Sequence, residues 1–262
     1  TALERDMTTT RTRSQFPQGG RHWDELNEEM KARSARDADI VGGRAPAYYF
    51  FAEDETYEIG KKAFNAYFSQ NALGNRVFPG LQSMEMDVLD YGLGLFSAPE
   101  GAHGVFSSGG SESIFLAMKS ARDAHRAKTK VGRETPLNLV VPITVHPAFD
   151  KAALAMDIEM RRAPLRPDRR VDVDAMRELI DANTMALVGS APCFPHGVID
   201  PIEELSRLAI EKGTWLHVDA CVGGWMAPFF TRIGRATPPF DFRFPGVRSI
   251  SADLHKFGFC PK

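Results

Sequence analysis

The sequence predicts an α/β fold with a mostly parallel sheet flanked by helices. From residue 105 onward, short apolar runs rich in β-branched residues alternate with amphipathic helical segments. Such alternation at short spacing is typical of parallel strands joined by crossover helices. The composition, with 43% hydrophobic and 25% charged residues among 262, is ordinary for a globular domain.

The first 70 residues precede this alternation. Residues 1–20 are rich in Thr, Arg and Gly and predict a flexible tail. Trp23, Leu26 and Met30 share one helical face, which predicts a short helix, and residues 55–70 predict a second one. We therefore expect a tail over 1–20, an N-terminal helical segment over 21–70 and a large cofactor-binding domain over 71–262.

The elements of the large domain follow in order. A turn at 78–80 precedes a helix over 81–95, and a Gly-rich turn at 109–110 opens the next helix. Pro201 and Gly213 bracket a later helix, as helix start and stop preferences require. The remaining predicted helices are 148–156 and 174–183, and the predicted strands are 137–143, 158–165, 185–189, 215–219 and 247–251.

Charge and cysteine content exclude several classes of function. The net charge of -2 has no basic bias and gives no indication of nucleic-acid binding. Three cysteines argue against a disulfide framework and fit a reducing compartment.

No apolar run approaches the roughly 18 residues that span a bilayer, and the N-terminus lacks a signal-peptide core. We expect a cytoplasmic protein without a transmembrane segment.

The Gly-rich turn is the first candidate site. Gly109, Gly110 and Ser111 end an extended segment and open a helix, where free N–H groups and the helix dipole favour phosphate. The same residues could simply make a tight connection. The turn matches neither the P-loop nor the dinucleotide-binding pattern.

Two ionisable residues follow predicted strands. Asp219 ends the strand 215–219, where it could cap a turn or accept the proton of a pyridine nitrogen. Lys256 follows the strand 247–251 and precedes aromatic residues; it is either a surface lysine or a desolvated amine able to form an imine. Cys221 is interpreted as a small buried filler.

Histidines and aromatic residues supply further candidates. His146 follows the strand 137–143 and could stack on a flat ring or be an ordinary polar group. His196 lies in a loop on the same expected edge of the sheet. The aromatic residues 48–51 could pack against a neighbour or contact substrate, and the apolar residues 225–230 could pack or line a channel. Taken together, a phosphate cradle, a histidine, an acid and a lysine in this order predict a pyridoxal phosphate (PLP) site; no metal site is predicted.

The chain resembles the sphingosine-1-phosphate lyases of the PLP-dependent group II decarboxylase family. The resemblance covers residues 70–262 well and 20–70 loosely. It is carried by the motifs Phe78-Pro79-Gly80-Leu81, Ser108-Gly109-Gly110-Ser111-Glu112-Ser113, Phe194-Pro195-His196-Gly197, His217-Val218-Asp219-Ala220 and Ser251-Ala252-Asp253-Leu254-His255-Lys256.

The resemblance implies a fold-type I, homodimeric PLP enzyme with active sites at the subunit interface. Lys256 would carry PLP as a Schiff base, Asp219 would pair with the pyridine nitrogen, and His146 would stack over the ring. The cofactor phosphate would meet Gly110, Ser111 and His255. Lys262 matches a second family lysine on the substrate side, and both it and Lys256 are expected to be catalytic.

The sequence departs from the family in one loop. Gly74 stands where the family often has a histidine linked to the substrate phosphate, in the run that begins at Asn71. A family tyrosine corresponds to Tyr48 or Tyr49. These residues, with His196 and Lys262, are the substrate-side candidates. Because family members continue into a C-terminal small domain, the chain is expected to be C-terminally incomplete.

The resemblance leads to one principal functional hypothesis. It is a PLP-dependent lyase that cleaves a phosphorylated amino alcohol, such as a sphingoid base 1-phosphate, into an aldehyde and phosphoethanolamine. An amino-acid decarboxylase of the same family is the alternative. A non-catalytic protein of the same fold is a third hypothesis, and the presence of both Lys256 and Asp219 disfavours it.

Overall fold

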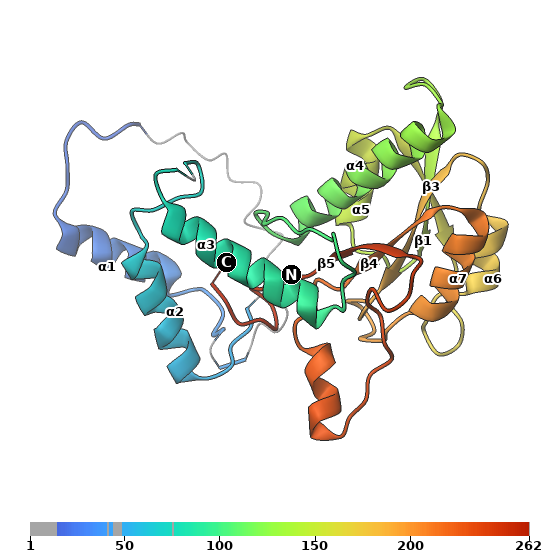
Figure 1. Cartoon of the computed structure of the whole chain (residues 1–262). Coiled ribbons are helices and arrows are strands. Elements are labelled where there is room, and N and C mark those ends of the chain that lie inside the picture. The colour runs from blue at the N-terminus through green and yellow to red at the C-terminus, as the bar shows by residue number, and fades with distance from the viewer. Residues whose placement is uncertain (1–14, 41, 44–48, 75, 262) are drawn as a thin grey trace, which may run out of the picture. The chain divides into compact units, whose positions relative to one another are not determined.

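The structure is a computed structural model that describes residues 15–40, 42–43, 49–74 and 76–261 (Figure 1). The chain divides into two compact units between residues 46 and 47. In the first unit, the predicted helix is α1 (Trp23–Ser34), which has no buried residue. Arg21 and Arg33 both form ion pairs with Glu29 on its surface. Its apolar residues therefore remain exposed within this unit.

The second unit begins with two helices. The first, α2 (Asp54–Ala66), ends before the predicted bound at residue 70. At its end the N–H of Tyr67 is shared between the carbonyls of Ala63 and Phe64, and the N–H of Gln70 then bonds to the carbonyl of Tyr67, three residues back, which forms a turn. The next, α3 (Pro79–Leu95), begins two residues earlier than predicted. Proline is accommodated in a first helical turn because its missing N–H has no partner there.

The predicted parallel sheet is confirmed. Its strands run in the order β2-β1-β3-β4-β5, and every neighbouring pair is parallel. The strands are β1 (Leu137–Pro142), β2 (Ile158–Ala163), β3 (Thr184–Ser190), β4 (Trp215–Asp219) and β5 (Val247–Ser251). β1 and β3 are buried along their whole length, which explains their continuous apolar sequences.

Helices cover both faces of this sheet (Figure 1). One face packs on α4 (Gly110–Thr129) and α5 (Ala148–Ala155), and the other packs on α6 (Val173–Glu178) and α7 (Ile202–Lys212). Alternate residues of β3 serve the two cores: Leu187 faces α7, whereas Ala186 and Val188 face α4.

The helix predicted over 174–183 is shorter than expected, because the side chain of Asp181 forms hydrogen bonds that replace the helical ones. Asp181 accepts hydrogen bonds from the Asn138 side chain at 2.8 Å and from the N–H of Asn183 at 2.8 Å. Local side-chain hydrogen bonds of this kind compete with the helical ladder. The helix α6 consequently ends at Glu178.

Strand register places one set of polar residues together. Ser190 of β3 pairs with Asp219 of β4, and Asp219 pairs with Ser251 of β5. All three residues are the last of their strands. The carboxyl edge of a parallel sheet is where ligands bind in open α/β folds, so this register prepares a site.

His217 lies fully buried in β4 beneath that edge. The Trp215 indole N–H can only donate, and it donates to Ser249 Oγ at 2.8 Å. The Ser249 hydroxyl can therefore donate to His217 Nδ1 at 2.8 Å, which leaves the ring proton on Nε2 for Ser251 Oγ at 3.2 Å. Burial lowers the pKa of His217 to about 4, so its ring is neutral at pH 7.

This depressed pKa predicts acid sensitivity. The unfolded histidine binds a proton near pH 6.5, whereas the folded one does so only near pH 4. Stability is therefore fully present above pH 6.5 and is lost as the pH falls toward 4, by about 2 kcal/mol between pH 7 and pH 5 at roughly 1.4 kcal/mol per pH unit. Urea unfolding at both pH values should show this loss in the wild type and a smaller loss in His217→Gln. Equal losses in the two proteins would contradict the assignment.

Candidate functional site

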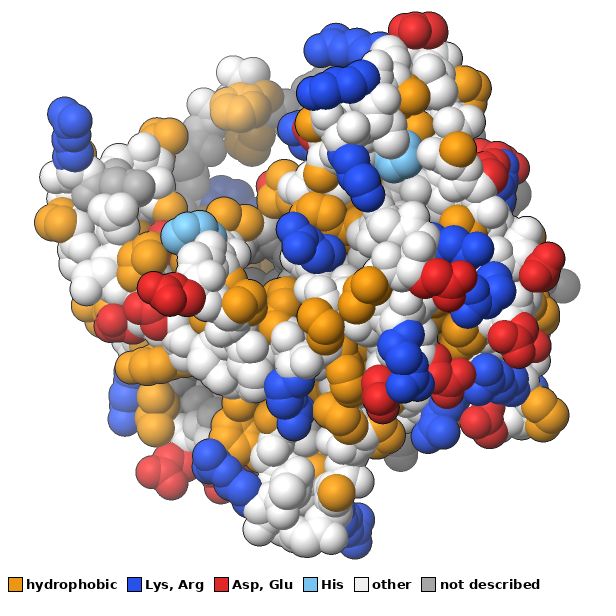
Figure 2. All heavy atoms as spheres, turned by 45° about the vertical axis from the view of Figure 1, so that its right-hand side comes forward, with side chains coloured by type: hydrophobic (Ala, Val, Ile, Leu, Met, Phe, Trp, Pro, Cys, Tyr) orange, Lys and Arg blue, Asp and Glu red, His pale blue; other side chains and the backbone are white. Residues whose placement is uncertain are grey.

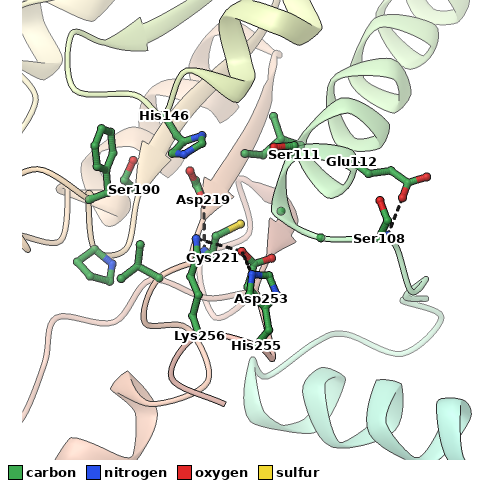
Figure 3. Close-up of a pocket in the computed structure, with 16 residues that line it drawn as sticks. Ser108, Ser111, Glu112, His146, Ser190, Asp219, Cys221, Asp253, His255 and Lys256 are labelled. Atoms are coloured by element: carbon green, nitrogen blue, oxygen red, sulfur yellow. Dashed lines mark hydrogen bonds and ion pairs between the residues drawn. The ribbon is translucent and has the colours of Figure 1, made fainter. Parts of the chain in front are cut away.

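A cavity of about 290 Å³ opens at the carboxyl edge of the sheet. Its lining comes from the start of α4, from the ends of β3 and β4, and from the segments that follow β1, β3, β4 and β5. Figure 3 shows the side chains of His146, Asp219 and Lys256 gathered around this space, with Ser111 of α4 facing them. Residues that are far apart in the sequence thus meet in one place.

The start of α4 forms a cradle of backbone. Gly109 has a φ of +142°, a conformation that side-chain-bearing residues rarely adopt. A Cβ atom on Gly110 would lie 2.7 Å from Asp253 Oδ2 and 3.0 Å from Cys221 Sγ, so only glycine fits there. The first N–H groups of a helix have no partner within the helix, and they face the cavity together with the positive end of the dipole. This arrangement suits a phosphate group.

Serine and glutamate side chains brace the cradle. The hydroxyls of Ser107 and Ser113 lie 2.6 Å apart. The N–H of Ser108 donates to Glu112 Oε2 at 2.6 Å, and this bond lowers the pKa of the Glu112 carboxyl. In Figure 3, Glu112 and Ser108 lie to one side of the other labelled residues, at the edge of the cavity that they help to line. Their hydrogen bond fixes the turn.

Asp219 brings a carboxylate to the end of β4 with only 8% of its surface exposed. Its Oδ1 accepts a hydrogen bond from the N–H of Cys221 at 3.1 Å. The Cys221 thiol donates to Ser251 Oγ at 3.3 Å, and burial raises its pKa well above the usual range. Cys221 is therefore a neutral, buried thiol, as the sequence indicated, although it also lines the cavity.

Lys256 meets an acid that sequence reasoning did not single out. Lys256 Nζ lies 3.0 Å from Asp253 Oδ2, and His255 Nε2 lies 3.8 Å from the same oxygen. Asp253 is only 6% exposed. An acid three residues before the candidate lysine, after a buried strand, was the available signal. This ion pair orients the amine at the floor of the cavity (Figure 3).

His146 and Phe194 form one wall. His146 Nδ1 accepts the N–H of Ala148 at 3.1 Å, so a neutral ring carries its proton on Nε2. The edge of the ring meets Phe194 with centroids 5.4 Å apart and an interplanar angle of 72°. Ser190 and Pro192 also line the cavity and were not named from the sequence, whereas Phe194 was named only as part of the motif 194–197. Ser190 is the last residue of β3, and neither it nor Pro192 has a side chain whose chemistry alone indicates a site.

The three substrate-side candidates that the structure describes, Tyr49, Asn71 and His196, do not line the cavity. His196 is exposed in its loop and does not line the cavity. The Asn71 side chain accepts the N–H of Leu73 at 3.0 Å, and the Tyr49 ring packs edge-on against Tyr57 with centroids 6.4 Å apart. Tyr48 and Lys262 lie outside the described residues.

The apolar run 225–230 serves packing. The Trp225 ring packs on Phe96 with centroids 5.8 Å apart, and its indole N–H donates to the carbonyl of Ala252 at 3.4 Å. Part of the run enters a 3₁₀ helix, η1 (Ala227–Ile233). Of the two interpretations of this run, packing and a channel lining, the contacts support packing.

The cavity fits a flat, phosphorylated cofactor with an aldehyde. The Gly110 cradle can hold its phosphate, Asp219 can face a ring nitrogen, and Lys256 offers an amine. Among the described residues, no cluster of three or more His, Cys, Asp or Glu could hold a metal ion. Over the same residues, no helix is long and apolar enough to cross a membrane.

Comparison with known proteins gives consistent matches. The chain is 39% identical over 248 residues to sphingosine-1-phosphate lyase 1 of Mus musculus, covering 94% of this chain and 43% of the mouse protein. It is 40% identical over 245 residues to the sphingosine-1-phosphate lyase of Arabidopsis thaliana, covering 91% of this chain and 44% of the plant protein. The chain thus spans less than half the length of these relatives.

A solved structure agrees with the sequence matches. The sphingosine-1-phosphate lyase Bpss2021 of Burkholderia pseudomallei K96243 superimposes with a TM-score of 0.88 at 37% identity, covering 97% of this chain and 60% of that one. The pyridoxal-dependent decarboxylase conserved domain matches residues 62–261. That match includes the cradle, His146, Asp219 and Lys256, and the cofactor that it implies is PLP. With its fold, its cavity and this match in agreement, the chain belongs to the pyridoxal-dependent decarboxylase family.

Proposed function

We propose that the chain is the cofactor-binding part of a PLP-dependent carbon–carbon lyase. The observation that carries this proposal is the convergence of Lys256, Asp219 and His146 on one cavity beside the cradle at Gly110. The proposed substrate is a phosphorylated amino alcohol such as a sphingoid base 1-phosphate, and the products are an aldehyde and phosphoethanolamine. The substrate class is supported by the 37–40% identity to sphingosine-1-phosphate lyases.

Each polar side chain of the cavity has a distinct proposed task. When bound, PLP supplies a conjugated ring that accepts the electron pair released at the substrate's α carbon. Asp219 would hold a proton on the ring nitrogen through its carboxylate, and its burial would strengthen that charge interaction. Gly110 and Ser111 would hold the phosphate through backbone N–H groups, and His146 would pack against the ring. Lys256, positioned by Asp253, would retain the cofactor through Nζ.

Carbon–carbon cleavage also needs a base for the substrate's β-hydroxyl. That proton leaves oxygen as the Cα–Cβ bond breaks, the carbonyl of the aldehyde forms, and the α carbon later gains a proton. Among the described residues, the nitrogen bases that line the cavity are His146, His255 and Lys256. A base within hydrogen-bond reach of the hydroxyl is required, and these three are the candidates that the described part of the chain supplies.

Amino-acid decarboxylation is the alternative, and the name of the matched domain favours it. The same cradle, acid and lysine would serve, with carbon dioxide rather than an aldehyde released from the α carbon. Product analysis separates the two reactions. With a sphingoid base 1-phosphate the lyase releases a fatty aldehyde, whereas with a panel of amino acids a decarboxylase releases carbon dioxide. Carbon dioxide as the sole product would overturn the lyase proposal.

We further propose a homodimer with shared active sites, located in the cytoplasm. Large exposed apolar side chains support a partner surface, among them Phe64, Phe68, Leu73 and Tyr91. Exposed apolar patches of this kind mark interaction surfaces. All three cysteines are free, which fits a reducing compartment. The lipid-like character of the substrate belongs to the same proposal.

Removing the lysine amine should remove the covalent link to the cofactor. Lys256→Ala is expected to lose the visible absorbance of the PLP-loaded protein and the adduct fixed by borohydride, because Lys256 is the only lysine among the described residues that line the cavity. Mass spectrometry of the reduced protein measures this. Lys151→Ala, an exposed lysine on α5, is the matched control and should keep the adduct. An adduct that survives in Lys256→Ala would refute the assignment.

Neutralising the acid should slow the reaction without emptying the site. Asp219→Asn keeps the shape and the hydrogen bond from Cys221, but it loses the negative charge. We expect kcat to fall about 100-fold or more, as when one preorganised electrostatic group is removed. Cofactor absorbance should persist at saturating PLP, so single-turnover kinetics can isolate the chemical step. An unchanged kcat would show that Asp219 does not face the ring nitrogen.

A further inference from the structure

A second, arginine-lined cavity lies at the other end of α4. It measures about 440 Å³ and is formed by the last turns of α4, the loop 133–136 and residues 155–157. Arg122, Arg126 and Arg133 line it. About 24 Å of helix separates Gly110 from Arg126 at 1.5 Å per residue, and the two cavities share no lining residue. The arginine-lined cavity is therefore distinct from the proposed cofactor site.

Positive charge is concentrated around this cavity. Residues 119–134 contain six Lys or Arg and two Asp or Glu, whereas the whole chain has a net charge of -2. Figure 2 shows basic side chains gathered at the top of the view, over the end of α4. The pKa of His125 is lowered, first by burial of the ring and then by the nearby positive charges of Lys128 and Arg126. The local potential is thus positive.

Helix stabilisation does not explain the whole cluster. Basic residues in a last helical turn interact favourably with the helix dipole, which accounts for Arg126 and Lys128. Arg133, however, belongs to the loop beyond the helix and still lines the same cavity. Arg122 and Arg126 are four residues apart and share one helical face. Three guanidinium groups from two segments therefore line one cavity, although their like charges repel one another.

The guanidinium of Arg126 is both fixed and unsatisfied. Its Nη2 donates to the carbonyl of Arg133 at 3.1 Å. Its Nε is buried and has no hydrogen-bond partner among the described residues. A buried donor without an acceptor is destabilising, and an unseen ion or ligand is one of its ordinary explanations.

Acidic residues nearby leave the arginines available. Arg122 bonds to Asp123 through Nε at 3.0 Å and Nη2 at 2.9 Å, which leaves its Nη1 for another acceptor. Glu134 and Asp157 also line the cavity. Within the described part of the chain, neither forms an ion pair with the three arginines. Arg122 is paired with Asp123, whereas Arg126 and Arg133 have no ion-pair partner among these residues.

We propose that this cavity binds a phosphate monoester. Guanidinium groups match the oxygens of a phosphate in a forked, bidentate way, which an ammonium group cannot do. The volume lies within the usual range for small-molecule sites and exceeds what a bare ion needs. A soluble phosphate ester and a lipid headgroup with a terminal phosphate share this chemistry. The inference does not depend on the proposed lyase reaction.

The test uses the PLP-loaded protein after gel filtration has removed the excess cofactor, because free PLP is itself a phosphate monoester and would compete for the arginine-lined cavity. Calorimetric titration with glycerol 3-phosphate should show one saturable site. Arg133→Gln and Arg122→Gln should each raise Kd at least tenfold. Arg207→Gln, an exposed arginine on α7, removes the same charge and should leave Kd unchanged. PLP absorbance should be the same in all four proteins.

Two results would overturn the proposal. One is the lack of any saturable binding to glycerol 3-phosphate or to vesicles of phosphatidylcholine with phosphatidic acid. The other is an equal effect of Arg207→Gln and Arg133→Gln, which would indicate general charge screening. If the wild type co-sediments with the vesicles and Arg133→Gln does not, the bound phosphate monoester is a lipid headgroup. Binding of glycerol 3-phosphate alone would identify a soluble ester.

Discussion

The parallel register of β3, β4 and β5 is the constraint on which the proposed active site depends. It sets Ser190, Asp219 and Ser251 side by side at the ends of their strands. From there the chain needs only five residues to reach Lys256. Because β3 and β4 are buried on both faces, a one-residue slip between them would exchange the two cores and misplace the carboxylate. The polar ladder through His217 reinforces this register, since its hydrogen bonds link β4 to β5.

The helix α4 contributes through both of its ends. Its N-terminus supplies the glycine cradle at the sheet edge, where unpaired N–H groups favour an anion. Its C-terminal turns supply Arg122 and Arg126 to a separate cavity. Its middle is held to the sheet by Ile114, Met118 and Ala121. One rigid helix therefore positions two anion-binding regions of different construction, one of backbone amides and one of guanidinium groups.

Much of the fold was readable from the sequence because its elements are locally encoded. The strands 215–219 and 247–251 were predicted to the residue. The ends of β1, β2 and β3 differ from the prediction by one or two residues. The helix boundaries at α2, α3 and α6 differ by two residues or more, where capping, proline or side-chain hydrogen bonds decide the end of a helix. At these helix ends, alternative hydrogen bonds differ little in free energy, and the spacing of apolar residues does not show which of them forms.

The sequence by itself determined the parallel α/β architecture, the order of cradle, histidine, acid and lysine, and the PLP family to which they point. Those features depend on neighbouring residues and on strand ends, which local spacing encodes. Only the tertiary structure decided that Asp253 pairs with Lys256, that Phe194 meets His146, that His196 stays outside the cavity, and that Arg133 joins Arg122 and Arg126. The pair of Asp253 and Lys256 had a signal in its spacing of three residues, but the direction of both side chains did not. The other pairings depend on distances across the fold, which no spacing in the sequence specifies.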